Sequence, residues 1–229
     1  MIFSILRIFS EGITVSGLCY VFARIFIIFT SFPVHECAHA WAAYKLGDDT
    51  ARLKGRLTLA PFAHLDLIGT LMILLVGFGY AKPVPVNIRN FKNRKRDFAL
   101  TALAGPLSNL IMALLFFVIS NVFRLFIKES EDVCYILGLF FLYAGNINVA
   151  LAVFNLLPIP PLDGSRLATA ILPDRFYYRI MQYERYLMIG LFVLLMVPMF
   201  STALSTLIGW ISHGIEFIAW LPFMSKLNF

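Results

Sequence analysis

The chain has 229 residues, of which 60% are hydrophobic and only 14% are charged. Soluble globular domains carry roughly 45–50% apolar and about 25% charged residues, so this composition excludes a soluble enzyme, a disordered segment and a disulfide-stapled secreted domain. The net charge of +6 is interpreted as basic loops that fix the topology of a membrane protein, in preference to nucleic-acid binding. The sequence therefore predicts an integral membrane protein whose partners include the lipid bilayer and no nucleic acid.

The first predicted element is a membrane helix that begins at Gly12 or Ser16 and ends at Leu46. Gly47 is well placed to terminate this helix, because glycine readily adopts the left-handed conformation that follows many helix ends. The helix contains two histidines and a glutamate beside them. Ionisable side chains at membrane depth are costly, so their presence in this helix indicates a functional site.

Residues 67–81 are apolar, but 15 residues at about 1.5 Å each reach only roughly 22 Å, which is less than the roughly 30 Å thickness of the hydrocarbon core. Basic sequence flanks this segment on both sides, in residues 45–56 and 82–97. Both features favour a half-inserted or re-entrant segment over a full crossing. Residues 82–87 then alternate proline with valine, which predicts a short extended edge strand rather than a helix.

Three uncharged stretches follow the predicted edge strand, and each is longer than the roughly 20 mostly apolar residues that a membrane helix needs. They cover residues 98–123, 133–162 and 186–215. The helix in the stretch 133–162 is expected to end at residue 157, because the prolines at 158, 160 and 161 cannot continue it. A fourth span is predicted over residues 186–209, and residues 210–223 are predicted to form a short or interfacial segment.

The distribution of charge among the loops predicts the orientation of the chain. Residues 124–132 form an acidic loop, whereas the loops at 45–56, 82–97 and 163–185 are rich in lysine and arginine. Basic loops of membrane proteins remain on the cytoplasmic side. We therefore expect a multi-pass protein of the cytoplasmic membrane, with these three loops in the cytoplasm.

Together these elements predict an all-α polytopic membrane bundle of four to six membrane segments, with the half-inserted segment and the edge strand as additions. No internal repeat or linker divides the sequence, so residues 1–229 are predicted to form one membrane domain. Its core is expected to cover about residues 13–172, and residues 186–223 are expected to supply the C-terminal membrane segments.

The first predicted helix contains the pattern H-E-x-x-H, in which His35 and His39 are four residues apart. Residues i and i+4 lie on one face of a helix, so both imidazoles can bind the same metal ion. Glu36 lies beside them, where a carboxylate can accept a proton from the attacking water. Zinc is the preferred ion, one per chain, because catalytic zinc sites use three protein ligands and leave one position open.

Asp163 is the candidate for the third ligand. It follows the proline-rich segment of residues 155–162 and precedes Gly164, which permits a sharp turn. Irregular backbone at membrane depth is tolerated only where protein buries it or where it lines a wet cavity. The predicted topology places both His39 and Asp163 near the cytoplasmic ends of their helices, so the two parts of the site converge on one side of the membrane.

These motifs resemble the site-2 protease family of intramembrane zinc metalloproteases. The resemblance covers about residues 13–172 and rests on three motifs in order. They are His35-Glu36-Cys37-Ala38-His39, Ala104-Gly105-Pro106-Leu107-Ser108-Asn109, and the run from Asn155 to Gly164 that reads N-L-L-P-I-P-P-L-D-G. The sequence between the first two motifs is similar to the compact bacterial branch that lacks PDZ and CBS domains.

The resemblance implies a zinc-dependent endopeptidase that cuts a single-span membrane protein or peptide within or near its membrane segment. His35, His39 and Asp163 would be the zinc ligands, with Glu36 as the general base. Asn155 and Asn109 match polar positions that orient the substrate backbone or assist the oxyanion.

Two further roles remain open at the level of sequence. An unwound substrate can add as a strand to residues 82–87, which makes Val84 and Val86 candidate binding residues. His64 is either an accessory ligand or gate, or a residue that caps the loop before the half-inserted segment. Two alternatives to an intramembrane endopeptidase are a zinc hydrolase of a lipid-linked peptide and a non-catalytic membrane scaffold or chaperone that retains the fold.

Overall fold

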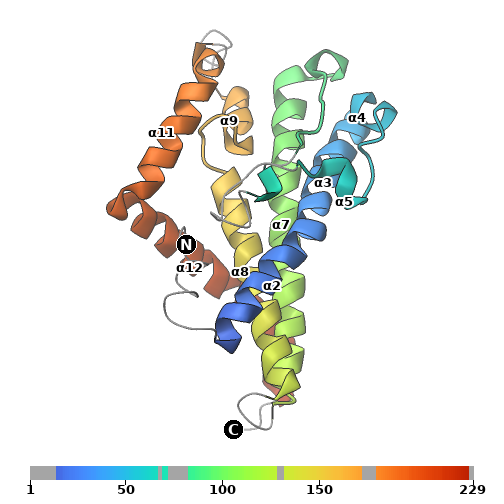
Figure 1. Cartoon of the computed structure of the whole chain (residues 1–229). Coiled ribbons are helices and arrows are strands. Elements are labelled where there is room, and N and C mark those ends of the chain that lie inside the picture. The colour runs from blue at the N-terminus through green and yellow to red at the C-terminus, as the bar shows by residue number, and fades with distance from the viewer. Residues whose placement is uncertain (1–13, 67–68, 72–81, 128–131, 172–178, 227–229) are drawn as a thin grey trace.

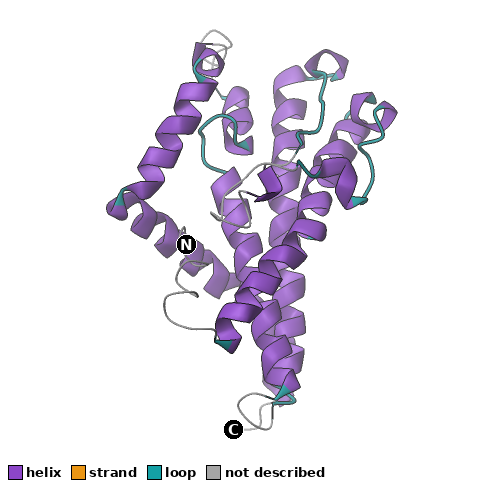
Figure 2. Ribbon diagram, in the orientation of Figure 1, coloured by secondary structure: helices purple, strands orange, loops and turns teal. Residues whose placement is uncertain are grey.

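The computed structural model describes residues 14–66, 69–71, 82–127, 132–171 and 179–226 of the chain. Helices joined by loops make up these residues, and no β-strand occurs among them (Figure 2). Four helices of the described part are long and apolar enough to cross a membrane: Val15–Lys45, Arg94–Arg124, Val133–Asn155 and Pro198–Met224. The prediction of an all-α multi-pass membrane protein is confirmed.

The first span consists of two helices, α2 (Val15–Phe29) and α3 (Ser31–Lys45), which meet at Thr30 (Figure 1). The hydroxyl of Thr30 donates a hydrogen bond of 2.7 Å to the carbonyl of Phe26. Pro33 lies in the first turn of α3, where its missing N–H is tolerated. The predicted end of this span is confirmed: Leu46 caps α3, and Gly47 follows with a φ of 106°.

The two helices at the centre of the bundle are α7 (Arg94–Arg124) and α8 (Val133–Asn155), with α3 against α7 and α2 against α8. Their shared core includes the buried ring of Phe117. A Cβ at Gly145 of α8 would come within 2.5 Å of that ring, so glycine permits the two helices to approach closely. Helix α7 begins four residues before the predicted position because the side chain of Asn93 caps it.

The predicted fourth span over residues 186–209 is wrong. Helix α11 (Glu184–Met196) ends at Val197, and α12 (Pro198–Trp220) begins at the next residue, followed by the 3-10 turn η3 (Leu221–Lys226). Proline removes a backbone donor and forces the residue before it into an extended conformation, and Val197 has φ −74° and ψ 118°. The helix long enough to span therefore lies twelve residues later than predicted, and residues 210–220 belong to it.

Helix α12 packs against both central helices through its inward face. The residues of this face that contact the core around Phe117 are Leu204, Ile208, Ile211, Ile215 and Ala219. At the far end, Arg124 of α7 forms an ion pair of 3.0 Å with Glu216 of α12. These contacts attach the C-terminal helix to the end of the bundle opposite the short helices described next (Figure 1).

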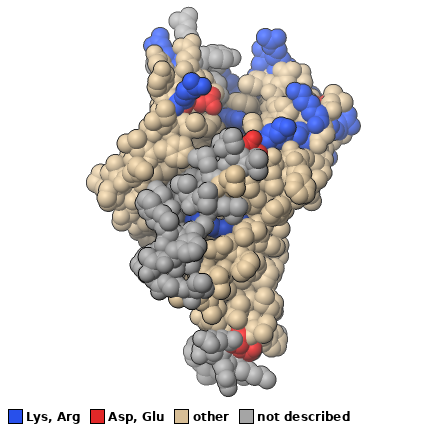
Figure 3. All heavy atoms as spheres, in the orientation of Figure 1, with Lys and Arg blue, Asp and Glu red and all other residues tan. Residues whose placement is uncertain are grey.

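Short elements gather at the other end of the bundle. Those between α3 and α7 are α4 (Thr50–Leu53), α5 (Pro61–His64) and η1 (Ile88–Asn90), and those after α8 are α9 (Asp163–Leu167) and η2 (Ala168–Ala170). Lysine and arginine side chains collect at this end (Figure 3).

The segment between α5 and η1 contains two of the predicted elements. Most of the predicted half-inserted segment, residues 67–81, lies outside the described residues. Residues 82–87 are not helical, as predicted, but the predicted edge strand is not formed: they pair with no strand among the described residues.

Candidate metal centre

Three donor atoms from distant parts of the chain meet between α3 and α9. His35 and His39 project from one face of α3, and Asp163 is the first residue of α9. All three residues are buried, with exposed fractions of 7%, 4% and 7%. His39 Nε2 lies 3.1 Å from His35 Nε2 and 3.2 Å from Asp163 Oδ2, and His35 Nε2 lies 3.3 Å from the same oxygen. The structure therefore brings the three predicted ligands together.

The size of this donor triangle fits a tetrahedral zinc ion. Ligand atoms about 2.0–2.1 Å from zinc stand about 3.3 Å apart along each edge of a tetrahedron. The measured separations of 3.1–3.3 Å match that edge on all three sides. Two imidazoles and one carboxylate form the usual donor set of a catalytic zinc site and leave the fourth corner for water or substrate.

A backbone carbonyl fixes the orientation of His39. Its Nδ1 lies 2.7 Å from the carbonyl oxygen of Thr101 on α7, and a carbonyl can only accept. Nδ1 therefore carries the hydrogen, and the lone pair of Nε2 faces the donor triangle. This arrangement, in which a second group holds the imidazole in the metal-binding tautomer, is typical of zinc histidines.

Gly105 allows α7 to pass close to both histidines. A Cβ at this position would lie 2.3 Å from His39 Nε2 and 2.6 Å from His35 Cε1, distances that real Cβ atoms do not show. Thr101, Gly105 and Asn109 are spaced four residues apart, so they share the face of α7 that lies along α3. The sequence contains this spacing, although its motif alone does not reveal the role of each residue.

Gly164 positions the third ligand in a comparable way. A Cβ there would lie 2.2 Å from the carbonyl oxygen of Leu156, the residue that caps α8. The close contact folds the chain back after the proline-rich segment, so that Asp163 points toward α3. Arg166, one turn further along α9, places a nitrogen 3.8 Å from Asp163 Oδ1.

The other predicted site residues occupy different surroundings. Glu36 is buried on α3 beside His35, with 9% of its surface exposed. Asn109 is 1% exposed, and its Oδ1 has no hydrogen-bond partner among the described residues. Asn155 instead donates to the carbonyl of Leu151 in its own helix, at 3.0 Å. Asn109 thus lies one turn from Gly105 on the same face of α7, whereas Asn155 shows only a bond within α8.

His64, Val84 and Val86 lie near α3 but outside the donor triangle. His64 is fully buried, and its Nε2 donates a hydrogen bond of 2.8 Å to the backbone carbonyl oxygen of Thr58. Val84 is 7% exposed and forms a hydrophobic cluster with Ala40 and Ala51, against which Val86 also packs. The valine side chains therefore face the protein, which leaves their backbone for any outside partner.

Asp48 is a buried residue that the sequence analysis did not single out. Its carboxylate accepts hydrogen bonds from Thr50, from the backbone amide of Asn87 and from the side chain of Asn90. Burial raises the pKa of this carboxyl, but the hydrogen bonds outweigh burial and hold the pKa below its ordinary value. The group is therefore ionised at neutral pH. Asn87 and Asn90 lie about forty residues away, so no local sequence pattern reveals these two partners.

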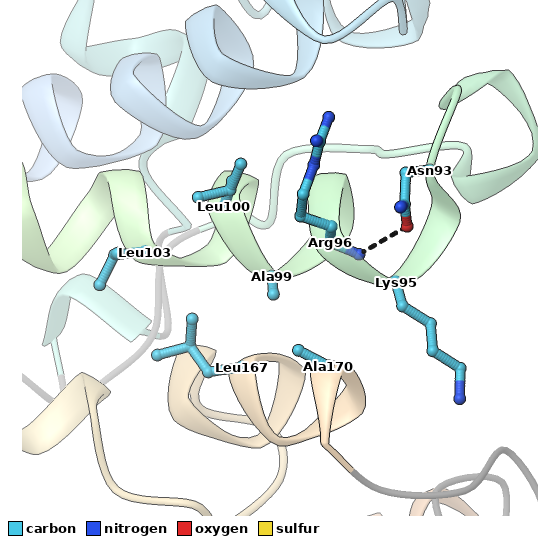
Figure 4. Close-up of a pocket in the computed structure, with 8 residues that line it drawn as sticks. All are labelled: Asn93, Lys95, Arg96, Ala99, Leu100, Leu103, Leu167 and Ala170. Carbon is cyan, nitrogen blue, oxygen red and sulfur yellow. Dashed lines mark hydrogen bonds between the residues drawn. The ribbon is translucent and has the colours of Figure 1, made fainter.

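A cavity of about 550 Å³ lies between the start of α7 and the segment formed by α9 and η2. It is lined by Asn93, Lys95, Arg96, Ala99, Leu100, Leu103, Leu167 and Ala170. Figure 4 shows Leu167 and Ala170 facing Ala99 across it. None of the candidate ligands lines this cavity, so the chemistry is assigned to the donor triangle.

Comparisons with known proteins agree with this geometry. The model of peptidase family M50 matches residues 23–198, which include all three donor residues. YwhC of Bacillus subtilis, named as a zinc metalloprotease, is 43% identical over 77% of this chain and 81% of its own length. Rip2 of Mycolicibacterium smegmatis, also named so, is 33% identical over 66% of this chain and 59% of its own length. No match to a solved structure is found.

Proposed function

Since this chain belongs to peptidase family M50 and is a metalloprotease, we propose that it is an intramembrane zinc endopeptidase in which His35, His39 and Asp163 hold the metal. The observation that carries the proposal is the buried donor triangle, whose edges fit tetrahedral zinc. Two of its three donors, His35 and His39, lie in the span Val15–Lys45, which is apolar enough to cross a membrane. A site so placed can reach peptide bonds that soluble proteases cannot.

The proposed mechanism assigns proton transfer to Glu36. Zinc in such sites supplies Lewis-acid polarisation of the scissile carbonyl and lowers the pKa of the attacking water to about 7. Glu36, buried beside His35, takes the proton from that water and later delivers it to the leaving amine. Asn109, with an amide oxygen that has no partner among the described residues, is available to the substrate backbone.

The substrate is proposed to be a single-span membrane protein or peptide that binds in an extended form. A helix hides its carbonyls in hydrogen bonds, so a membrane segment must unwind before it can be cut. Residues 82–87 would receive the unwound segment as an added strand. Burial of the Val84 side chain supports this proposal, since it anchors the middle of the segment to the protein, while the amides of Val84 and Val86 have no hydrogen-bond partner among the described residues.

We further propose that the active site faces the cytoplasm. Lysine and arginine side chains collect at the end of the bundle that carries α4, α9 and the start of α7 (Figure 3). Basic ends of membrane proteins remain on the cytoplasmic side. The donor triangle, at the start of α9, lies toward the same end (Figure 1).

The proposed function is tested with the purified protein in lipid vesicles and a reporter peptide that spans the bilayer once. We expect one zinc per chain by elemental analysis, loss of cleavage on chelation, and recovery when zinc is restored. Mass spectrometry of the products should place the cut within or next to the membrane segment. A cut confined to soluble loops, or cleavage that survives complete zinc removal, would contradict the proposal.

Substitution of Val86 by proline tests the added strand. Proline removes one backbone donor, and losing a hydrogen bond of about 1 kcal/mol should raise KM about fivefold. Zinc content should stay at one per chain. The matched control is Val86→Thr, which keeps the branched side chain and the N–H, and it should preserve KM. Equal KM values for the proline and threonine variants would remove the strand from the proposal.

A further inference from the structure

Asp48 connects the end of the metal-binding helix α3 to residues 82–87, the segment that is proposed to receive the substrate. It follows α3 by three residues, and its carboxylate is fully buried. Oδ1 accepts from the Thr50 amide at 3.1 Å, from the Thr50 hydroxyl at 2.5 Å and from the side-chain amide of Asn90 at 2.7 Å. Oδ2 accepts from the backbone amide of Asn87 at 2.7 Å. One oxygen thus holds its own loop and Asn90, and the other holds the end of the 82–87 segment.

The opposite end of this segment is also fixed to the protein. The amide of Lys82 donates to the carbonyl of His64 at 2.8 Å. The guanidinium of Arg56, a buried side chain, donates to the carbonyl of Lys82. Between the two ends, the side chain of Val84 packs against Ala40, which belongs to α3 and follows His39 directly. Three sets of contacts therefore fix residues 82–87 relative to the metal-binding helix.

The backbone between these attachments remains available. Pro83 and Pro85 have no N–H, so Val84 and Val86 supply the only amide donors of residues 83–86. No hydrogen bond to either amide occurs among the described residues. Alternate residues of an extended chain direct their N–H and C=O groups to the same edge. The two valines therefore offer their backbone groups on one edge, which suits pairing with a single added strand.

We propose that Asp48 is a positioning residue for substrate: by holding Asn87 and Asn90, it keeps the 82–87 edge at a fixed place beside His35 and His39. This inference rests on the proposed function, because it presupposes that the edge receives a peptide. Asp48 acts through the strand and contacts neither the metal site nor the scissile bond. Its loss should therefore weaken substrate binding and leave the chemical step and the metal intact.

The test compares Asp48→Ala with wild type in zinc-loaded full-length protein, using the membrane-spanning reporter peptide. Since the variant removes the acceptor of several hydrogen bonds, we expect KM to rise at least about tenfold. We expect kcat to stay within about twofold and zinc to remain at one per chain. The matched control is Asp49→Ala, which removes the neighbouring carboxylate and its surface ion pair of 3.0 Å with Arg52. We expect the KM of Asp49→Ala to equal that of wild type.

A second substitution tests the positioning role of Asp48 if Asp48→Ala does not fold. Asn90 is exposed, and Asn90→Asp sets a second carboxylate against Asp48 and replaces a hydrogen bond by repulsion. We expect KM to rise more than in Asn90→Ala, which only removes the donor. Unchanged KM in the folded variants, or a fall in kcat at constant KM, would overturn the inference. Glu36→Gln, measured alongside, separates these outcomes from failure of the proposed function, since it shows whether the observed cleavage depends on the proposed base.

Discussion

Glu36→Gln is expected to abolish cleavage and to leave zinc bound. Glutamine has the shape of glutamate but cannot accept the proton of the attacking water, and loss of a general base lowers rates by about 100- to 10,000-fold. Glu36 is not one of the three donors of the triangle, so metal binding should persist. The measurement pairs the rate of reporter cleavage with the zinc content of the same preparation.

The control for this prediction is the same chemical change elsewhere in the membrane domain. Glu216 in α12 pairs with Arg124 at the opposite end of the bundle, so Glu216→Gln should leave cleavage unaltered. Equal cleavage by wild type and Glu36→Gln would remove Glu36 from the mechanism. Loss of zinc together with activity in Glu36→Gln would assign it to the metal site instead.

Gly105→Ala is expected to weaken zinc binding by about 100-fold, the upper end of the range for groups that orient metal ligands. The added methyl group would lie 2.3 Å from His39 Nε2 and 2.5 Å from His39 Cε1. Either the imidazole rotates away from the donor triangle, or α7 moves away from α3 and takes the carbonyl of Thr101 with it. Zinc titration of the apoprotein measures the effect independently of cleavage.

Gly209→Ala is the matched control, because a Cβ at that position of α12 meets nothing within 4 Å. Alanine favours a helix over glycine by about 1 kcal/mol, so this variant should bind zinc normally and be no less stable. If Gly105→Ala bound zinc with wild-type affinity, the close approach of α7 would not be what defines the metal centre.

The parts of this molecule that the sequence predicts are those with local patterns. The four-residue spacing of His35 and His39 places them on one helical face, and the prolines before Asp163 indicate where the chain turns back. To predict that the three ligands meet, the only further step was the topology, which places both segments near the same side of the membrane. Hydrophobic length, which marks spans well, is less precise about their ends.

The features that the sequence did not predict also have identifiable physical causes. Residues 186–209 are uncharged throughout, and this uniformity concealed the break at Pro198, which the proline rule could have located. The carbonyl of Thr101 is a backbone group, so its side chain carries no signal of the bond to His39. Asp48 pairs with residues some forty positions later, and a single sequence does not record such pairings.

The donor triangle unites segments that are 124 residues apart in the chain. Closing a flexible loop of that length costs about 4 kcal/mol in chain entropy. In this fold the closure is made by helix packing, because α3 and α9 both rest against α7. An arriving ion would meet an assembled site, in contrast to zinc fingers, whose chains fold only when metal is bound. Withdrawal of zinc should therefore silence the enzyme reversibly, without unfolding it.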